Sequence, residues 1–294
     1  MIDRLAMFMV LARHEHFGRA AEELGITQPS LSSSLKALED QLGVQLVRRG
    51  SRYRGLTPEG ERVLDWARRI VGDARTMQAE LRARRTGVTG RLRLGVIPTA
   101  MPRIAGLTAP FLIRYPGAEV AILSRSSDEI RDQIAALELD AGVTYLDGTA
   151  PGRVQTVPLF TENLCLVDRS AETGPASWAE AATRPLCLLT PDMQNRRIVA
   201  AELAKAGSPV APRVESNSML AILSHVTTGA WAAILPNALA EGLPLPRGVT
   251  ARPLTGGTGH VVGLVAAERE PRPPLIEALF QVARSVNDDS FRLS

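Results

Sequence analysis

The feature that most constrains this chain is a long amphipathic repeat that begins at Pro58 and ends near Gly87. Apolar side chains recur in it with alternating spacings of four and three residues, at Val63, Ala67, Ile70, Ala74, Met77 and Leu81. This spacing predicts one long helix with an apolar seam, and such a seam favours pairing with the same helix of a second copy. A single helix packed on its own domain is the alternative, because the period persists for less than three heptads.

The segment before this helix predicts three short helices. Their periodic residues lie in the ranges 2–11, 17–24 and 27–42, and glycines follow the second and third ranges. Pro29 is tolerated in the first turn of the third helix, where its missing N–H costs little, and the hydroxyl of Thr27 can cap that helix. The leucines of the third helix share one side, and Pro29, Ser30, Ser33 and Lys36 share the opposite side. That polar face is therefore free to contact a partner.

A basic hairpin is predicted after the third helix. Residues 46–49 and 53–57 read as two short strands around a tight polar tip at 50–52. Three short helices followed by such a wing form a compact unit that can insert one helix into the DNA major groove. We therefore expect residues 1–58 to be a winged helix-turn-helix DNA-binding domain.

The charge distribution agrees with a DNA-binding N-terminus. Residues 1–90 carry 15 Lys and Arg against 11 Asp and Glu, whereas the rest of the chain carries 19 against 20. A weak basic surplus of this kind fits a phosphate-binding domain attached to a neutral sensor, although an ordinary solvated surface gives similar numbers.

Other features of the composition exclude several classes of protein. At 45% hydrophobic and 22% charged residues the chain is typical of a globular protein, and no apolar run approaches the roughly 18 residues that a membrane span needs. The N-terminus lacks the apolar core of a signal peptide, so we expect a cytoplasmic protein. Cys165 and Cys187 lie far apart without other ligands at metal-binding spacing, which predicts core thiols and no metal site.

The C-terminal part alternates short apolar strands with helices, which predicts βαβ units and a mainly parallel sheet. The expected fold class is α/β, with a dimerising linker helix at 59–89 and an effector-binding domain at 90–294. Two lobes are expected in that domain, one from 90–161 with 267–294 and the other from 162–266. Two crossing strands would join these lobes and leave a cleft between them.

The N-terminal motifs resemble those of the LysR-type transcriptional regulators. They are Phe17-Gly18-Arg19-Ala20-Ala21, Leu24, Gln28-Pro29-Ser30-Leu31-Ser32, Leu38-Glu39, Leu42-Gly43, Leu46, Arg48 and Leu56-Thr57-Pro58-Glu59-Gly60. The resemblance extends over the whole chain. In the C-terminal part it rests on the order of the predicted elements more than on sequence motifs. It implies a winged helix-turn-helix, a dimerising linker, a sensor similar to periplasmic binding proteins, and a homotetramer that binds operator DNA.

The residues expected to contact DNA fall into two groups. Base readers are expected at the start of the third helix, where Gln can bond to adenine and Ser to several bases: Gln28, Pro29, Ser30 and Ser33. Ser32 is also expected to contact DNA. Phosphate contacts are expected from Lys36, Arg48, Arg49, Arg52 and Arg54. The run Ser32-Ser33-Ser34 and Val47 depart from the residues that many family members carry, which leaves the base preference open.

The residues expected to bind the effector lie after strands of both lobes. The resemblance implies that Thr99, Ala100, Ser126, Ser127, Thr190, Gln194 and Asn195 line the site, and Asn217 is expected to face them across the cleft. Ligands of open α/β sheets lie at such carboxyl ends of strands. Free N–H groups near Thr99 predict a small anion, such as a carboxylate, and ordinary helix caps are the alternative. In the second lobe, Trp231 occupies a position where the family has a glycine. This bulky side chain predicts a cleft of different shape.

The sequence disfavours two other classes of protein. An enzyme is disfavoured because no nucleophile motif or glycine-rich phosphate loop is present, and His14, His16, His225 and His260 are scattered. A periplasmic-type solute carrier is disfavoured by the N-terminal 90 residues. We expect a non-enzymatic regulator without a cofactor, and the Met193-Gln194-Asn195-Arg196-Arg197 phrase resembles a branch of the family found near formate dehydrogenase genes.

Overall fold

The computed structural model describes residues 1–48, 53–147, 154–208, 212–242 and 245–286. The chain divides into two compact units, one containing Met1–Arg85 and the other containing Thr86–Ile134 and Glu138–Ser294. None of the described helices is both long and apolar enough to cross a membrane.

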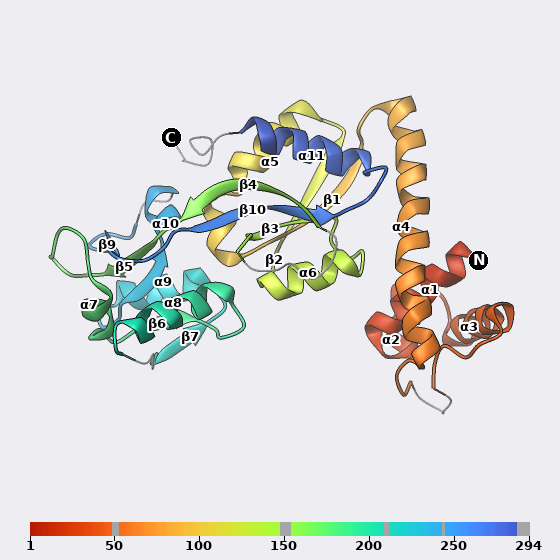
Figure 1. Cartoon of the computed structure of the whole chain (residues 1–294), viewed down its shortest axis with the longest axis horizontal. Helices are drawn as coiled ribbons and strands as arrows, with labels where there is room; N and C mark the ends of the chain where they lie inside the picture. The colour runs from red at the N-terminus through yellow and green to blue at the C-terminus, as the bar shows by residue number, and fades with distance from the viewer. Residues whose placement is uncertain (49–52, 148–153, 209–211, 243–244, 287–294) are drawn as a thin grey trace. The chain divides into compact units, whose positions relative to one another are not determined.

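The N-terminal unit is built on three short helices, α1 (Ile2–His14), α2 (Phe17–Glu23) and α3 (Gln28–Leu42). The three helices lie together in Figure 1. They pack around a small core that includes Phe8, Leu11, Leu31 and Leu38, each almost fully buried. The N-terminus of α3 is capped by Thr27, whose hydroxyl accepts a hydrogen bond from Ser30 N at 3.3 Å. Gly43 ends α3 in the left-handed conformation, with φ of 72°. These caps confirm the predicted boundaries of the third helix.

The chain after α3 is held by the carboxylate of Glu39. Its Oε1 atom accepts hydrogen bonds from Leu46 N at 2.7 Å and from Val47 N at 3.3 Å. Val47 then forms an antiparallel bridge with Leu56, which closes the base of the predicted hairpin. Thus Glu39, one of the family motif residues, has a structural role at the base of the wing.

The long helix α4 spans Pro58–Thr86, as its repeat predicts. Its seam has two different surroundings. Val63 and Ala67 pack on the core of the N-terminal unit, as does Val71 from outside the predicted seam. Farther along, Ile70, Met77 and Leu81 are exposed by 39%, 56% and 58%, together with Trp66. The first part of the helix therefore packs on its own domain, and the later part of the seam is exposed in the isolated chain.

The motif before α4 fixes how that helix meets the rest of the unit. Thr57 Oγ1 accepts a hydrogen bond from Gly60 N at 2.9 Å and donates one to Gln45 O at 2.5 Å. A Cβ atom at Gly60 would lie 2.0 Å from Leu46 O, so only glycine allows this close approach of helix and chain.

The first lobe of the C-terminal unit is a five-stranded sheet in the order β2-β1-β3-β10-β4. Its elements are β1 (Gly90–Val96), η1 (Pro98–Arg103), α5 (Ala105–Arg114), β2 (Ala118–Ser124), α6 (Ser127–Ala135), β3 (Ala141–Tyr145), β4 (Val154–Glu162), β10 (His260–Ala267) and α11 (Pro274–Ser285). Helices α5 and α11 cover one face of this sheet and α6 covers the other (Figure 1). Strands β1, β2 and β3 are parallel, which confirms the predicted βαβ units.

The second lobe contains a sheet in the order β8-β5-β9 and the parallel pair β6-β7, which are joined by the bridge between Leu186 and Ala232. Its elements are β5 (Leu164–Asp168), α7 (Trp178–Ala182), β6 (Cys187–Leu189), α8 (Gln194–Lys205), β7 (Val214–Ser216), α9 (Met219–Thr227), β8 (Ala233–Pro236), α10 (Asn237–Gly242) and β9 (Thr250–Pro253). Leu164 and Leu166 pack toward α7 and α8, whereas Cys165 and Val167 pack toward α9 and α10. Successive side chains of β5 point to opposite faces, so both faces of this strand are buried.

The two lobes are joined by β4 and β10, which pair antiparallel along their length. Strand β10 also pairs with β3, so the whole of His260–Ala267 belongs to the first lobe. The predicted boundary at residue 266 therefore lies too late, because the backbone hydrogen bonds of β10 are made to strands of the first lobe. The return from the second lobe occurs before His260.

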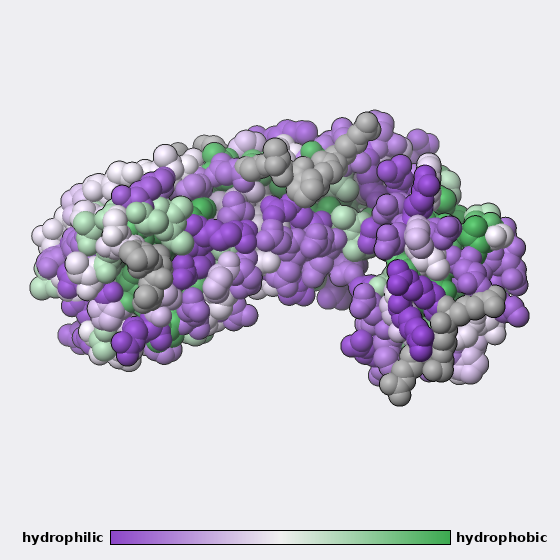
Figure 2. All heavy atoms as spheres, turned by 60° about the horizontal axis from the view of Figure 1, so that its bottom comes forward, coloured by the Kyte–Doolittle hydropathy of each residue, from purple (hydrophilic) through white to green (hydrophobic). Residues whose placement is uncertain are grey.

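The surface is mostly hydrophilic on the face that Figure 2 shows. Some large apolar side chains among the described residues are nevertheless exposed. Besides those of α4, they include Leu112 and Ile113 on α5, Ile122 on β2 and Leu220 on α9.

The contact at Gly60 gives a test of the N-terminal unit. Gly60→Ala places a methyl group against a backbone carbonyl, and we expect it to destabilise this unit by about 1–3 kcal/mol. Urea unfolding followed by circular dichroism measures the change, with Glu59→Ala as the exposed neighbouring control. Equal stability of Gly60→Ala and wild type would contradict the close packing of α4 on the chain after α3.

Candidate DNA-reading face and effector cleft

The predicted base-reading residues lie together on one exposed face of α3. Leu31, Leu35 and Leu38 are buried against the core of the N-terminal unit. The residues of this helix that are predicted to contact DNA are all exposed: Gln28, Pro29, Ser30, Ser32, Ser33 and Lys36. Because the leucines fix the rotation of the helix, the polar face is held outward, where the edges of bases can reach it.

The predicted phosphate contacts of the wing are only partly described. Arg48 is exposed, and its Nε donates a hydrogen bond to Leu56 O at 3.0 Å, which holds its side chain at the base of the hairpin. Arg54 is also exposed. Arg49 and Arg52 lie outside the described residues.

In the C-terminal unit, two of the predicted effector residues meet at a buried polar cluster. Thr99 comes from the first lobe and Asn195 from the start of α8 in the second lobe, and both are at most 3% exposed. Thr99 Oγ1 lies 3.3 Å from Tyr145 Oη, and Asn195 Nδ2 donates to Tyr145 Oη at 3.4 Å. Tyr145 Oη in turn donates to Glu162 Oε1. The cluster therefore joins the two lobes.

Glu162 is the charged member of this cluster. Burial raises the pKa of its carboxyl from 4.5 to about 7, although hydrogen bonds from Tyr145, Thr99 and Asn195 act in the opposite direction. The pKa of Tyr145 is raised well above 10, by burial first and then by the nearby Glu162 carboxylate. At neutral pH the cluster therefore changes charge at Glu162 and not at Tyr145.

A second pair of polar side chains borders this cluster. His260 stands opposite Glu162 in the pairing of β10 with β4, and its ring packs edge-on against Tyr145 with centroids 6.1 Å apart. Its Nδ1 atom lies 2.7 Å from Asp147 Oδ2. The amide of Gln194 reaches Asp147 O at 3.5 Å from the other lobe.

The other predicted effector residues have different surroundings. Ser126 caps α6, since its hydroxyl accepts from Glu129 N at 3.2 Å while Glu129 Oε2 accepts from Ser126 N at 2.7 Å. Ala100 and Ser127 are buried, Thr190 is half-buried, and Asn217 is exposed. The alternative of ordinary helix caps therefore holds for Ser126.

The backbone near Thr99 differs from the predicted anion site. Residues Pro98–Arg103 form a short 3-10 helix, and α5 begins only at Ala105. Two prolines in this turn lack an N–H, and Ala100 N already donates to Ile97 O at 3.0 Å. The Thr99 hydroxyl lies against Tyr145. This turn consequently presents few free N–H groups to an anion.

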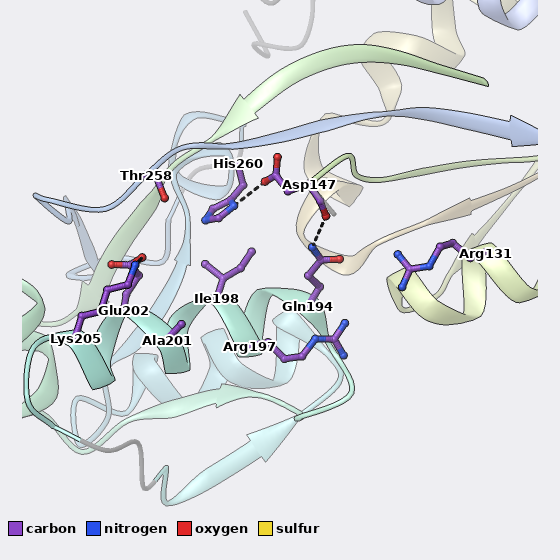
Figure 3. Close-up of a pocket in the computed structure, with 10 residues that line it drawn as sticks. All are labelled: Arg131, Asp147, Gln194, Arg197, Ile198, Ala201, Glu202, Lys205, Thr258 and His260. Atoms are coloured by element: carbon purple, nitrogen blue, oxygen red, sulfur yellow. Dashed lines mark hydrogen bonds and ion pairs between the residues drawn. The ribbon is translucent and has the colours of Figure 1, made fainter. Parts of the chain in front are cut away.

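A cavity of about 530 Å³ opens beside the cluster (Figure 3). It is lined by residues of both lobes: Arg131, Asp147, Gln194, Arg197, Ile198, Ala201, Glu202, Lys205, Thr258 and His260. Arg197 also forms an ion pair with Asp128 of the first lobe at 3.2 Å. The volume of this cavity suits a small molecule.

The sequence reasoning missed Tyr145, Glu162, Asp147 and His260. A signal for Glu162 was present, because this carboxylate ends a segment in which Leu159 and Phe160 are typical of a buried strand. A charged residue within a buried strand pattern needs a special environment. Strand pairing brings Tyr145 and His260 next to Glu162, and the sequence alone does not reveal this pairing.

Comparisons with known proteins cover most of the chain. Residues 2–61 match the family described as "Bacterial regulatory helix-turn-helix protein, lysR family". Residues 85–288 match the "LysR substrate binding domain" family.

Relatives and solved structures agree with this match. The HTH-type transcriptional regulator IlvR of Caulobacter vibrioides is 33% identical over 81% of this chain and 83% of its own length. A probable hydrogen peroxide-inducible genes activator of Streptomyces viridosporus is 34% identical over 56% of this chain, and the match spans 53% of that protein. A full-length OxyR variant from Pseudomonas aeruginosa has a TM-score of 0.75 and 27% identity, covering 97% of this chain and 94% of its own. Full-length CbnR complexed with its target DNA has a TM-score of 0.62 and 25% identity, covering 97% and 99%.

The raised pKa of Glu162 predicts how stability depends on pH. Between about pH 4.5 and 7 the native protein holds a proton that the unfolded chain has lost, so stability falls as pH rises through this window. The full shift corresponds to about 3 kcal/mol. We expect Glu162→Gln, which stays neutral, to remove this loss.

Denaturant unfolding at about pH 5 and about pH 8 measures how far the free energy of unfolding falls between these pH values in wild type and in Glu162→Gln. Glu119→Gln, on the exposed side of β2, is the matched control and should behave like wild type. If Glu162→Gln keeps the pH dependence of wild type, the carboxyl is not buried as described.

Proposed function

The chain belongs to the LysR family of bacterial transcriptional regulators, and from this premise we propose that it reads operator DNA with α3 and responds to a small molecule bound between its two lobes. Members of this family are DNA-binding regulators with an effector-binding domain and are not enzymes. A role on chromosomal DNA places the protein in the cytoplasm.

The observation that carries the DNA-reading proposal is the exposed polar face of α3. Gln28 and Ser33 carry donors and acceptors suited to base edges in the major groove. Lys36 lies on the same face, where an ammonium can contact a phosphate and fix the position of the helix. The relative CbnR was solved with its target DNA, which supports the same activity here.

We propose that the chain assembles through two apolar surfaces. The first is the exposed stripe of α4, formed by Trp66, Ile70, Met77 and Leu81, which suits pairing with the same helix of a second copy. The second surface comprises Ile113 of α5 and Ile122 of the edge strand β2, with Leu220 of α9 exposed on the other lobe. Two different interfaces per chain support the predicted homotetramer.

We propose the inter-lobe cleft as the effector site because residues of both lobes meet there and a cavity lies beside them. Thr99, Gln194 and Asn195 are the sequence-predicted residues that take part in these contacts. The small carboxylate and the link to formate metabolism have no support in these contacts and are not part of this proposal. A bound ligand acts only if it binds one arrangement of the lobes more tightly than another.

Peroxide sensing is a second candidate function, because several relatives bear the name of a hydrogen peroxide-inducible genes activator. The two cysteines of this chain are both buried. Burial raises the pKa of the Cys187 thiol to about 11, and its Sγ contacts Ala232 O at 3.5 Å. A thiol reacts as its thiolate, so this environment disfavours oxidation by peroxide. These contacts support a ligand-binding sensor over a thiol-based one.

The DNA-reading proposal predicts the effects of two substitutions. Gln28→Ala should reduce affinity for the DNA upstream of the protein's own gene by about 5- to 100-fold and relax base preference. Lys36→Ala should weaken binding to all sequences and flatten the salt dependence. Fluorescence anisotropy at several salt concentrations measures both. Gln78→Ala on the exposed side of α4 is the control, and wild-type binding by both α3 variants would refute the assignment of this face.

The assembly proposal predicts that charges on the α4 stripe break the dimer. Ile70→Asp and Met77→Asp would each bury unpaired carboxylates against their symmetry mates, which should weaken dimerisation by at least about 100-fold. Sedimentation velocity at micromolar concentration should show smaller species than wild type. Gln78→Asp adds the same charge outside the stripe and should leave assembly intact. Unchanged sedimentation of both stripe variants would show that another surface holds the dimer.

A further inference from the structure

Two buried polar atoms beside the start of β10 have no hydrogen-bond partner among the described residues. One is Nε1 of Trp178, on α7 of the second lobe, and the other is Nε2 of His260, on β10 of the first lobe. The indole N–H can only donate. Nδ1 of His260 lies 2.7 Å from Asp147 Oδ2, and a carboxylate can only accept, so Nδ1 carries a hydrogen and Nε2 of the neutral ring is an acceptor. A buried donor and a buried acceptor are therefore both unsatisfied.

Both side chains line one small hollow of about 20 Å³. Its other lining residues come from the junction of β4 with β5, from α8 and from the segment that returns from the second lobe: Asn163, Leu164, Ile198, Glu202, Leu254, Gly257 and Thr258. The hollow thus lies where the chain crosses between the lobes.

The two unpartnered atoms are directed toward this hollow. A Cβ atom at Gly257, a lining residue, would lie 3.4 Å from Trp178 Nε1, so the N–H edge of the indole faces that side. In Figure 3, the second ring nitrogen of His260 points away from Asp147, toward the side of Thr258. A donor from one lobe and an acceptor from the other lobe therefore approach the same hollow.

The volume of the hollow admits one oxygen atom of the size of a water molecule. A buried water needs roughly 10–15 Å³ and about two to four polar partners. Trp178 and His260 supply one donor and one acceptor. A hydroxyl oxygen can accept and donate through the same atom, whereas a carbonyl or carboxylate only accepts and an ammonium only donates. The polarity of the hollow therefore matches a hydroxyl group.

The hollow adjoins the larger cavity of about 530 Å³. Four residues line both of them: Ile198, Glu202, Thr258 and His260. A ligand in the larger cavity can therefore place one small substituent in the hollow. The charged side chains that line the larger cavity include both cations and carboxylates, so they complement no single sign of charge.

Other unpartnered atoms at the junction of the lobes do not line these two cavities. The hydroxyls of Ser127 and Thr190 and the Oε2 atom of Glu162 are buried without a partner among the described residues. None of these three residues lines the hollow or the larger cavity. The pair formed by Trp178 and His260 is therefore the one that a ligand in these cavities can satisfy.

We propose that the hollow is a hydroxyl-binding subsite of the effector cleft, in which one oxygen atom accepts from Trp178 Nε1 and donates to His260 Nε2. This inference rests on the proposed function of the cleft and names the chemistry of its ligand, a small alcohol or polyol. The hydroxyl connects a residue of one lobe with a residue of the other, so its ligand favours the arrangement in which both line the hollow. A water molecule has the same chemistry and is the competing occupant.

Cyclohexanol and cyclohexanone are suitable probes, because they have nearly the same shape and differ at one oxygen. The alcohol satisfies both Trp178 and His260, whereas the ketone leaves His260 without a donor. Isothermal calorimetry of the full-length protein at millimolar probe concentration should show cyclohexanol binding at least about fivefold more tightly. Trp178→Phe keeps an aromatic ring without the N–H and should weaken cyclohexanol by about 5- to 10-fold. Trp231→Phe, which alters an indole outside both cavities, is the control and should bind like wild type.

The indole N–H of Trp178 gives a direct readout of what occupies the hollow. The chain has three tryptophans, so protein labelled with ¹⁵N-tryptophan gives three indole signals, and the one missing in Trp178→Phe belongs to Trp178. Without a probe, this signal should show a nuclear Overhauser contact with a bound water. Saturating cyclohexanol should remove that contact and shift the signal, while the signals of Trp66 and Trp231 stay in place.

Three results would overturn the proposal. Equal affinity of wild type for the alcohol and the ketone would do so, and this comparison does not depend on the folding of any variant. A water contact at Trp178 that persists with saturating cyclohexanol would show that the hollow holds structural water only. No binding of either probe would exclude the subsite as well.

Operator binding measured in parallel separates this inference from the proposed function. If the protein binds its operator and responds to an effector, but cyclohexanol fails at Trp178, the hydroxyl subsite is wrong and the regulator proposal stands. If operator DNA is not bound at all, the proposed function itself fails.

Discussion

The pairing of β4 with β10 is the constraint on which the effector domain depends. These antiparallel strands join the two lobes and belong to the sheet of the first, so their register decides which side chains stand at the base of the cleft. That register places His260 opposite Glu162. A carboxyl group held there without solvent has a raised pKa and an unsatisfied oxygen, which makes the junction of the lobes sensitive to charge. Such a junction is suited to a ligand-controlled change of the lobes.

Much of the fold could be predicted from the sequence, because local patterns determine it. The caps Thr27 and Gly43 mark the ends of α3, and the apolar period of 58–87 predicts α4. The cleft was harder to predict, since it depends on strand pairing between segments far apart in the chain. Thr99 and Asn195 were predicted as effector residues from the family resemblance and remain a prediction, whereas Glu162 and His260 are brought together by the pairing of β4 with β10. The lobe boundary at 266 was misplaced for the same reason.

The two proposed sites belong to different units, and the proposed assembly of several copies offers one route for a signal between them. The stripe of α4 lies at the end of the N-terminal unit, and the apolar residues of α5, β2 and α9 lie on the two lobes. If copies of the chain meet through both surfaces, a change in the angle between the lobes alters the spacing of the α3 helices. The ligand would then change the bend of the bound DNA or the spacing of the half-sites that are contacted. The fraction of operator DNA that is occupied would change less.

The central claim is that Glu162 is a buried carboxyl that titrates near neutral pH at the junction of the lobes. The most direct measurement is a ¹³C NMR titration of the full-length protein with labelled glutamate side chains. The account predicts one carboxyl resonance that titrates near pH 7 and is missing in Glu162→Gln. If every glutamate titrates below about pH 5, as solvent-exposed carboxyls do, the account of the cleft is contradicted.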